Sequence, residues 1–187
     1  YMEFGEVKGF EAQVSASAGV VVLGNIAADK FDVHQNMTEE IHPIFREAAT
    51  LDRIHGFVEG WKIPRMQASM IARGWALNTE YFAEVMHALR DDLQYDTVVD
   101  QSICYDPASD QRDLTAIKRI CCAFVKLLFP NARTKEDIPK DEFIKYCLEP
   151  AKEMRQIIRY QLGIIDPKEY NTPKKRCVPN VQYNDEG

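Results

Sequence analysis

The chain has 187 residues, of which 45% are hydrophobic and 28% charged, a composition typical of a globular protein with one ordinary domain or two small ones. Its net charge of −6, from 23 basic and 29 acidic residues, argues against a protein whose whole surface binds nucleic acid. The longest apolar run, from Gly19 to Gly24, is too short to cross a membrane, and we expect no signal peptide. Because Tyr1 precedes Met2, we expect a piece of a longer protein.

The cysteines and histidines show no metal-ligand spacing, so we expect no metal site. The five cysteines lack a C-x-x-C pair, and an odd number without a framework is typical of a reducing cytoplasm. Cys121 and Cys122 are adjacent on a predicted helix and therefore point in different directions. Core thiols are favoured over zinc ligands.

The N-terminal stretch from Tyr1 to Ser17 is polar and interrupted by glycine, which predicts the end of a helix followed by a turn or hairpin. The β-branched run Ala18–Leu23 is typical of a strand buried on both faces of a parallel sheet. Asn25 follows this strand, at the edge where ligands of α/β sheets bind, so its amide could hold a water or a phosphate oxygen. A turn-capping role for Asn25 is the alternative, and local sequence alone favours it.

Arg53 lies between a predicted helix and a predicted strand. Thr38 is the expected N-cap of the helix, which reaches Leu51. The apolar run Ile54–Val58 predicts the strand, and Pro64 ends this region. An arginine at the mouth of a strand can reach a neighbouring subunit, where its planar guanidinium could bind two phosphate oxygens of a nucleotide. A salt bridge with a nearby carboxylate is the alternative, and nothing local decides between the two.

From about Arg65 onward the sequence predicts helices. Trp75 is expected to anchor the core. Helical spacing of apolar residues predicts one helix from Thr79 to about Leu93, one from Ser109 or Asp110 to just before Pro130, and two helices, or one kinked at Pro150, from Phe143 to Leu162. The stretch Asp92–Ser109 is expected to be a polar connector.

Arg112 lies in the first turn of the predicted helix that begins near Asp110. A cation at this end opposes the helix dipole, and a residue that breaks a local rule suggests a ligand. Asp113 beside it could offset the charge.

Several stretches resemble one protein family. The run Leu51–Pro64 is the most specific of them, and the similarity extends from Tyr1 to about Asp166. The other stretches are Tyr1–Glu3, Val22–Ile26 and Leu127–Pro130. Together they resemble the BrxL family, the Lon-like AAA+ proteins of BREX phage-defence systems.

The resemblance implies roles for three residues and a fold class. Asn25 matches the sensor-1 position, Arg53 the arginine finger and Arg112 the sensor-2 arginine of the lid. The implied fold is mainly α with a small α/β portion, a partial AAA+ core with its sensor-1 and arginine-finger strands followed by a helical lid. The expected domains are 1–65 for the core part, 66–166 for the lid and 167–187 for an extended tail or linker.

The resemblance also implies that the full-length parent is a cytoplasmic ATP-hydrolysing ring, a hexamer that uses ATP and Mg²⁺, handles DNA and defends against phage. A Ser-Lys protease dyad would lie in a later domain. Gly19 and Gly24 have phosphate-loop spacing, but the lysine and the Ser/Thr that should follow are missing. No apolar strand ends in Asp-Glu, so we expect this chain alone to be inactive and to hold no nucleotide tightly.

The central strand of such a sheet is also missing, so the two predicted strands would have unpaired backbone groups, and we expect them to be rearranged. A helical protein-interaction module without nucleotide function is the alternative reading of the chain.

Overall fold

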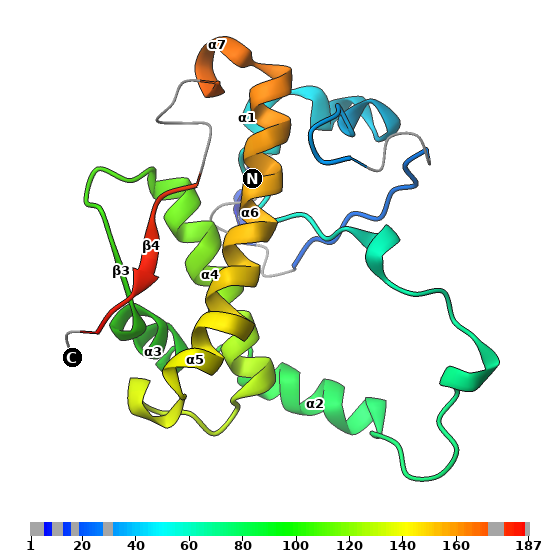
Figure 1. Ribbon diagram of the computed structural model, residues 1–187, viewed down its shortest axis with the longest axis vertical. Coiled ribbons are helices and arrows are strands. Elements are labelled where there is room, and N and C mark those ends of the chain that lie inside the picture. The colour runs from blue at the N-terminus through cyan, green and yellow to red at the C-terminus, as the bar shows by residue number, and fades with distance from the viewer. Residues whose placement is uncertain (1–5, 9–12, 16–18, 28–31, 172–177, 186–187) are drawn as a thin grey trace. The chain divides into compact units, whose positions relative to one another are not determined.

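A computed structural model describes residues 6–8, 13–15, 19–27, 32–171 and 178–185. The chain is mainly helical, and the strands of the described part form two antiparallel pairs (Figure 1). Its residues group into two compact units, a first unit of residues 1–54 and 158–176 and a second unit of residues 55–157 and 177–187. Helix α6 (Glu149–Ile165) contributes its N-terminal part to the second unit and its C-terminal part to the first.

The first unit begins with a hairpin. Strand β1 (Glu6–Lys8) pairs antiparallel with β2 (Gln13–Ser15), so that Glu6 lies opposite Ser15. The predicted hairpin is therefore confirmed, while the predicted helix end falls on residues outside the described part.

The predicted strand that leads to Asn25 is not formed. Residues 19–27 have neither helix nor strand conformation, and the side chains of Val21 and Leu23 are 85% and 93% exposed. A β-branched run becomes a strand only where a neighbouring strand accepts and donates its backbone hydrogen bonds, and no strand of the described part lies beside this run. The prediction of a buried parallel strand is wrong for this chain.

The predicted helix from Thr38 to Leu51 is replaced by three short pieces. They are the 3₁₀ turns η2 (Thr38–Glu40) and η3 (Pro43–Arg46) and the single α-helical turn α1 (Ala48–Leu51). Pro43 explains the interruption, because a proline has no N–H to donate and disfavours helical backbone at the preceding residue. His42, that preceding residue, has φ −53° and ψ 137°, and its Nδ1 caps η3 by accepting from the backbone N–H of Ile44.

Gln161 of α6 holds the chain that leads into η2. Its side chain is buried, its Oε1 accepts from the backbone N–H of Met37 at 2.9 Å, and its Nε2 donates to the carbonyls of Val33 and Gln35, both at 2.8 Å. This amide satisfies backbone groups that no regular secondary structure pairs. The short helix α7 (Pro167–Tyr170) follows α6.

The second unit contains most of the helices. Its elements in chain order are α2 (Thr79–Leu89), α3 (Gln94–Ser102), β3 (Ile103–Tyr105), α4 (Gln111–Leu128), the 3₁₀ turn η6 (Lys135–Asp137), α5 (Lys140–Phe143), the π-helical turn η7 (Ile144–Leu148), the start of α6, and β4 (Val181–Tyr183). Helix α4 confirms the prediction, because Asp110 caps it by accepting from the N–H of Arg112 at 2.9 Å. Helix α2 ends earlier than predicted, and Asn78 rather than Thr79 is its cap.

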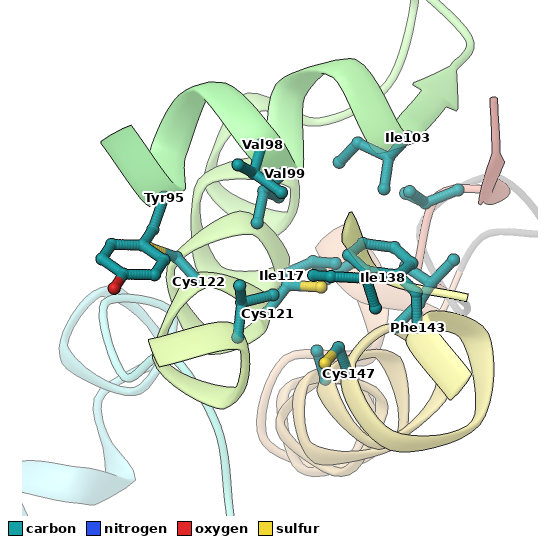
Figure 2. Close-up of a cluster of buried hydrophobic side chains, with 14 of the residues drawn as sticks. Tyr95, Val98, Val99, Ile103, Ile117, Cys121, Cys122, Ile138, Phe143 and Cys147 are labelled. Atoms are coloured by element: carbon teal, nitrogen blue, oxygen red, sulfur yellow. The ribbon is translucent and has the colours of Figure 1, made fainter. Parts of the chain in front are cut away.

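The core of the second unit lies where α3, α4 and the α5–η7 segment meet (Figure 2). Val98 and Val99 of α3 face Ile117 of α4, and Phe143 closes the cluster. Of the apolar face predicted for α4, Leu114, Ile117 and Cys121 are buried in this core, whereas Leu127 and Leu128 are exposed. Helix α3 lies inside the stretch predicted to be a polar connector, so that prediction is wrong, as is the prediction for Trp75, whose side chain is fully exposed.

Two further predictions concern the C-terminal part. Segments α5, η7 and α6 follow one another without a break, and the π-helical turn directly precedes Pro150, which agrees with one helix distorted at the proline. Residues 178–185 of the predicted tail are packed rather than a free linker, since β4 pairs with β3 and Val181 is buried. The predicted domain division at 65 and 166 refers to the parent module and stays a prediction. In the described part, no helix is long and apolar enough to span a membrane.

Candidate functional site

Arg53 lies next to Asp52, the C-cap residue of α1. Its backbone N–H donates to the carbonyl of Thr50 at 3.2 Å, and its guanidinium donates to the carbonyl of Ala49. The last carbonyls of a helix lack partners within the helix, and a cation there is favourable. The side chain is half-buried, and its described hydrogen bond goes to a backbone carbonyl rather than to a carboxylate.

The predicted strand after Arg53 is not formed either. Residues 54–59 have neither helix nor strand conformation, and their described backbone bond to another element goes to a helix, since Phe57 N–H donates to the carbonyl of Met154 in α6 at 3.1 Å. Gly56 allows this approach, because a Cβ atom at this position would lie 2.9 Å from Cδ1 of Ile120 and 3.0 Å from Cβ of Met154. The placement of Arg53 at the mouth of a strand is therefore wrong, and the arginine lies at a helix end instead.

Asn25 is exposed, at the end of the irregular run that was predicted to be a strand. Gly24, the residue before Asn25, lies against the side chain of Ile41, since a Cβ atom at Gly24 would be 2.7 Å from Cγ2 of Ile41. Asn25 and Arg53 both belong to the first unit, and in the described part of the chain no hydrogen bond joins them. A shared sheet edge, as the sequence predicted for these two side chains, is not formed.

Arg112 lies in the second unit, exposed in the first turn of α4. Asp113, the carboxylate that could offset its charge, has a second cation as its partner. The Asp113 carboxylate accepts from Nε of Arg155 at 2.7 Å, and the two side chains are each 1% exposed. This buried ion pair holds the first turn of α4 against α6. Because Arg112 lies in that turn, the ion pair also fixes the position of its backbone.

Sequence reasoning missed a hollow in the second unit. Its volume is about 350 Å³, and its residues come from the segment after Arg53, from α4 and from α6: His55, Arg119, Ile120, Ala123, Phe124, Leu127 and Met154. Nη1 of Arg119 lies 3.0 Å from Nε2 of His55. Because a guanidinium only donates, Nε2 of this histidine accepts and its proton is on Nδ1. The sequence signal for this hollow was a second row of apolar residues on α4, Ile120, Phe124 and Leu127, which lies beside the row that faces the core.

The described residues provide cations for phosphate but not a complete nucleotide site. The sequence has no phosphate loop, and in the described part no three His, Cys, Asp or Glu residues are grouped to hold a metal ion. Arg53 and Arg112 are the cations for which the sequence predicts phosphate contacts, and these contacts stay a prediction. The cradle and the ligands of Mg²⁺ would have to come from elsewhere in a larger protein.

Comparison with known proteins identifies a family and two curated relatives of this chain. Residues 1–176 match the model of a family described as Lon-like protease BrxL-like, ATPase domain. The chain is 28% identical over 192 residues to the Lon-like protease BrxL of Bacillus cereus (strain H3081.97), an alignment that covers all of this chain and 27% of that protein. It is 27% identical over 165 residues to the Lon-like protease BrxL of Escherichia coli O9:H4 (strain HS), covering 87% of this chain and 23% of that protein.

The chain therefore spans about a quarter of the length of these curated relatives. The family resemblance drawn from the sequence is confirmed. Since the family model covers nearly the whole sequence, the chain belongs to the family of Lon-like, BrxL-like ATPase domains.

Proposed function

We propose that this chain is the part of a Lon-like AAA+ ring motor that supplies sensor 1, the arginine finger and sensor 2, through Asn25, Arg53 and Arg112. The observation that carries the proposal is the family match over residues 1–176, which includes all three positions. The parent is a hexameric, ATP-hydrolysing ring that acts on DNA in the cytoplasm as part of phage defence.

The surroundings of Arg53 support its role. A guanidinium has five N–H donors, and the bond to the Ala49 carbonyl needs one of them. A γ-phosphate that is being cleaved develops negative charge on its oxygens, and a planar fork of donors can bind two of these oxygens at once. Arg53 acts in trans, on the nucleotide of the neighbouring subunit.

Arg112 and Asn25 support the same proposal from two other segments. Arg112 is exposed in the first turn of α4, so its guanidinium lies where an anion from outside the chain can contact it. The buried pair of Asp113 and Arg155 holds this turn in place while leaving the Arg112 side chain at the surface. Asn25 is exposed and can offer its amide to a water or a phosphate oxygen.

ATP and Mg²⁺ are bound by the phosphate loop and the acidic strand of the parent, which the present sequence lacks. When bound there, they supply the phosphoryl group and the metal charge for hydrolysis. The present residues contribute cations and an amide, and this chain alone binds ATP weakly.

The test is the substitution Arg53→Ala in the full-length parent. We expect kcat for ATP hydrolysis to fall about 1,000-fold or more, while nucleotide affinity and the fold are retained. Arg53→Lys keeps the charge but loses the fork of donors, and kcat should stay low. Arg46→Ala is the matched control, because Arg46 also donates to a backbone carbonyl, that of Glu39 at 2.8 Å, and should leave kcat unchanged.

A subunit-mixing experiment tests action in trans. Subunits with Arg53→Ala are mixed with subunits whose phosphate loop is inactivated, and activity is measured against each variant alone. A finger that acts across the boundary restores partial turnover, because some interfaces pair an intact loop with an intact arginine. Unchanged turnover in the Arg53→Ala ring would remove the assignment.

A helical protein-interaction module is the second candidate function. The observation that favours it is a run of bare apolar side chains between Ile63 and Leu77. Under this alternative, Arg53→Ala leaves ATP hydrolysis unchanged, whereas substitutions in the apolar run abolish assembly.

A further inference from the structure

The segment of residues 62–78, which we name the arm, is exposed along its whole length. It runs as a thread from the 3₁₀ turn η4 (Gly60–Lys62) to α2 and contains one further turn, η5 (Ala68–Met70) (Figure 1). Trp75 is fully exposed and Met66 is 79% exposed. The other large apolar side chains of the arm are also bare: Ile63, Met70, Ile71 and Leu77.

The composition of the arm is that of a protein interface. Trp, Met and Arg are the residue types enriched at interfaces, whereas Asp and Glu are depleted. The arm contains Lys62, Arg65 and Arg73 and no acidic residue, a formal charge of +3. Because the whole chain has a charge of −6, the remaining residues total −9. A bare apolar run of this size marks an interaction site.

The residues directly after the arm have the opposite charge. Residues 79–102, which form α2 and α3, contain six carboxylates and a single cation, Arg90, for a formal charge of −5. The six are Glu80, Glu84, Asp91, Asp92, Asp96 and Asp100. Helix α2 has no fully buried side chain, Tyr81 is 68% exposed and Leu93 is 75% exposed. The surface of α2 and α3 thus offers both carboxylates and apolar area.

We infer that the arm of one copy of this chain docks on the surface of α2 and α3 of a second copy. Charge complementarity supports this occupant, since the surface that faces the +3 arm keeps a formal charge of −2 even when Lys118, Lys126 and Arg133, which lie against α3 or the end of α2, are counted with Arg90. The apolar side chains argue against nucleic acid as the partner, because single strands are bound by stacking on aromatic rings and the arm has one aromatic residue among six large apolar ones. The contact is heterologous, so it can repeat from copy to copy.

The inference does not depend on nucleotide chemistry, and its test is therefore separate from that of the proposed function. Self-association of the 187-residue chain is measured by sedimentation velocity over a range of concentrations, without nucleotide. We expect association that weakens as salt is raised, because the attraction between exposed charges is screened. Trp75→Ala should weaken it about ten-fold or more, as loss of a central aromatic anchor does. Leu23→Ala is the control, since this side chain is equally bare but outside the arm.

A charge swap tests the docking surface. Arg73→Glu and Glu84→Arg should each weaken association, because each lowers the charge complementarity between the arm and the surface of α2 and α3. All these side chains are exposed, so circular dichroism should show the fold retained. Association that is unchanged in Glu84→Arg would overturn the assignment of α2 as the surface.

Photo-crosslinking identifies the partner directly. A benzophenone side chain is placed at position 75, and isotopically heavy and light chains are mixed before irradiation. Heavy–light cross-links from position 75 into residues 79–102 support the inference. Cross-links confined to one chain, a monomer at every concentration, or cross-linking to an added single-stranded oligonucleotide without self-association would each overturn it.

Discussion

The carboxylate of Asp113 lies 2.7 Å from Nε of Arg155, and both side chains are withdrawn from solvent. The pair joins the first turn of α4 to α6 within the second unit. Taking two charges out of water is costly, and their attraction offsets the cost only while both partners remain. The pair therefore stabilises the packing of α4 on α6 only while both side chains are present. Removing either one should lower the free energy of unfolding more than removing a surface ion pair does.

The first prediction follows from this asymmetry. Asp113→Ala leaves the buried guanidinium of Arg155 without its carboxylate, and we expect the free energy of unfolding to fall by about 3–5 kcal/mol. Glu149→Ala is the control, because Glu149 and Lys152 form an exposed pair worth less than about 1 kcal/mol. The measurement is urea unfolding followed by circular dichroism. Equal losses of unfolding free energy in the two variants would mean that the buried pair stabilises the fold no more than the exposed pair does.

A double variant separates pairing from packing. Asp113→Leu with Arg155→Met removes both charges and keeps apolar volume, so the double variant should be far more stable than the sum of the two single losses implies. A double-mutant cycle gives the coupling energy directly. Additive losses would mean that the two side chains stabilise the fold independently.

Local features of the sequence predicted α4 well. Helix α4 was found because its signals lie within a few residues of each other, namely the Asp110 cap and apolar side chains at helical spacing. The charged pairing behind it was not found, because Arg155 is distant in sequence and nothing local marks it as buried. The same applies to His55 and Arg119, which meet only through packing of the second unit.

The strand predictions failed for a different reason. A strand is stabilised by backbone hydrogen bonds to a neighbouring strand. The runs Ala18–Leu23 and Ile54–Val58 have the composition of strands, but among the described residues no strand pairs with them. Helix α3 was missed even though Tyr95, Val98 and Val99 have helical spacing and are buried. The charged residues between them and Pro107 after them favoured a connector.

The second prediction concerns Gly56, where the segment after Arg53 lies against Ile120 of α4 and Met154 of α6. A methyl group there would overlap Ile120 and Met154, so we expect Gly56→Ala to cost about 1–3 kcal/mol. Gly60→Ala is a matched control four residues on, since nothing lies within 4 Å of a Cβ atom there. Thermal unfolding of both variants tests this. If Gly60→Ala loses as much, the cost comes from backbone entropy or conformation and not from the contact.

The third prediction concerns thiol reactivity. Cys104 is exposed, whereas Cys121, Cys122 and Cys147 are buried in the core of the second unit. Burial raises the pKa of Cys122 and of Cys147 to about 12, so almost no reactive thiolate forms on them at neutral pH. Among these four, we expect alkylation of Cys104 alone in the native protein. Peptide mapping by mass spectrometry reads each site separately, and rapid labelling of Cys147 would contradict the packed core.

The same thiols give the fourth prediction, on pH. Their folded pKa of about 12 lies above 9.0, the ordinary pKa of a cysteine thiol, so between these values the folded state binds more protons than the unfolded state. The stability they contribute is complete below pH 9 and is lost as the pH rises toward 12. Unfolding free energy measured from pH 8 to 10 should therefore fall, and Cys147→Ala should flatten that slope. An unchanged slope would mean that other groups set the alkaline limit.

The fifth prediction tests whether the C-terminal strand belongs to the fold. Val181 is fully buried, and β4 lies antiparallel to β3, with Gln182 opposite Cys104. We expect Val181→Ala to cost about 1–3 kcal/mol, because it removes buried methyl groups and leaves a small cavity. Gln182→Ala changes the opposite, exposed face of the same strand and should stay within about 0.5 kcal/mol of the parent. Urea unfolding compares the two. Equal stability of both variants would mean that the burial of Val181 contributes nothing to the stability of the core.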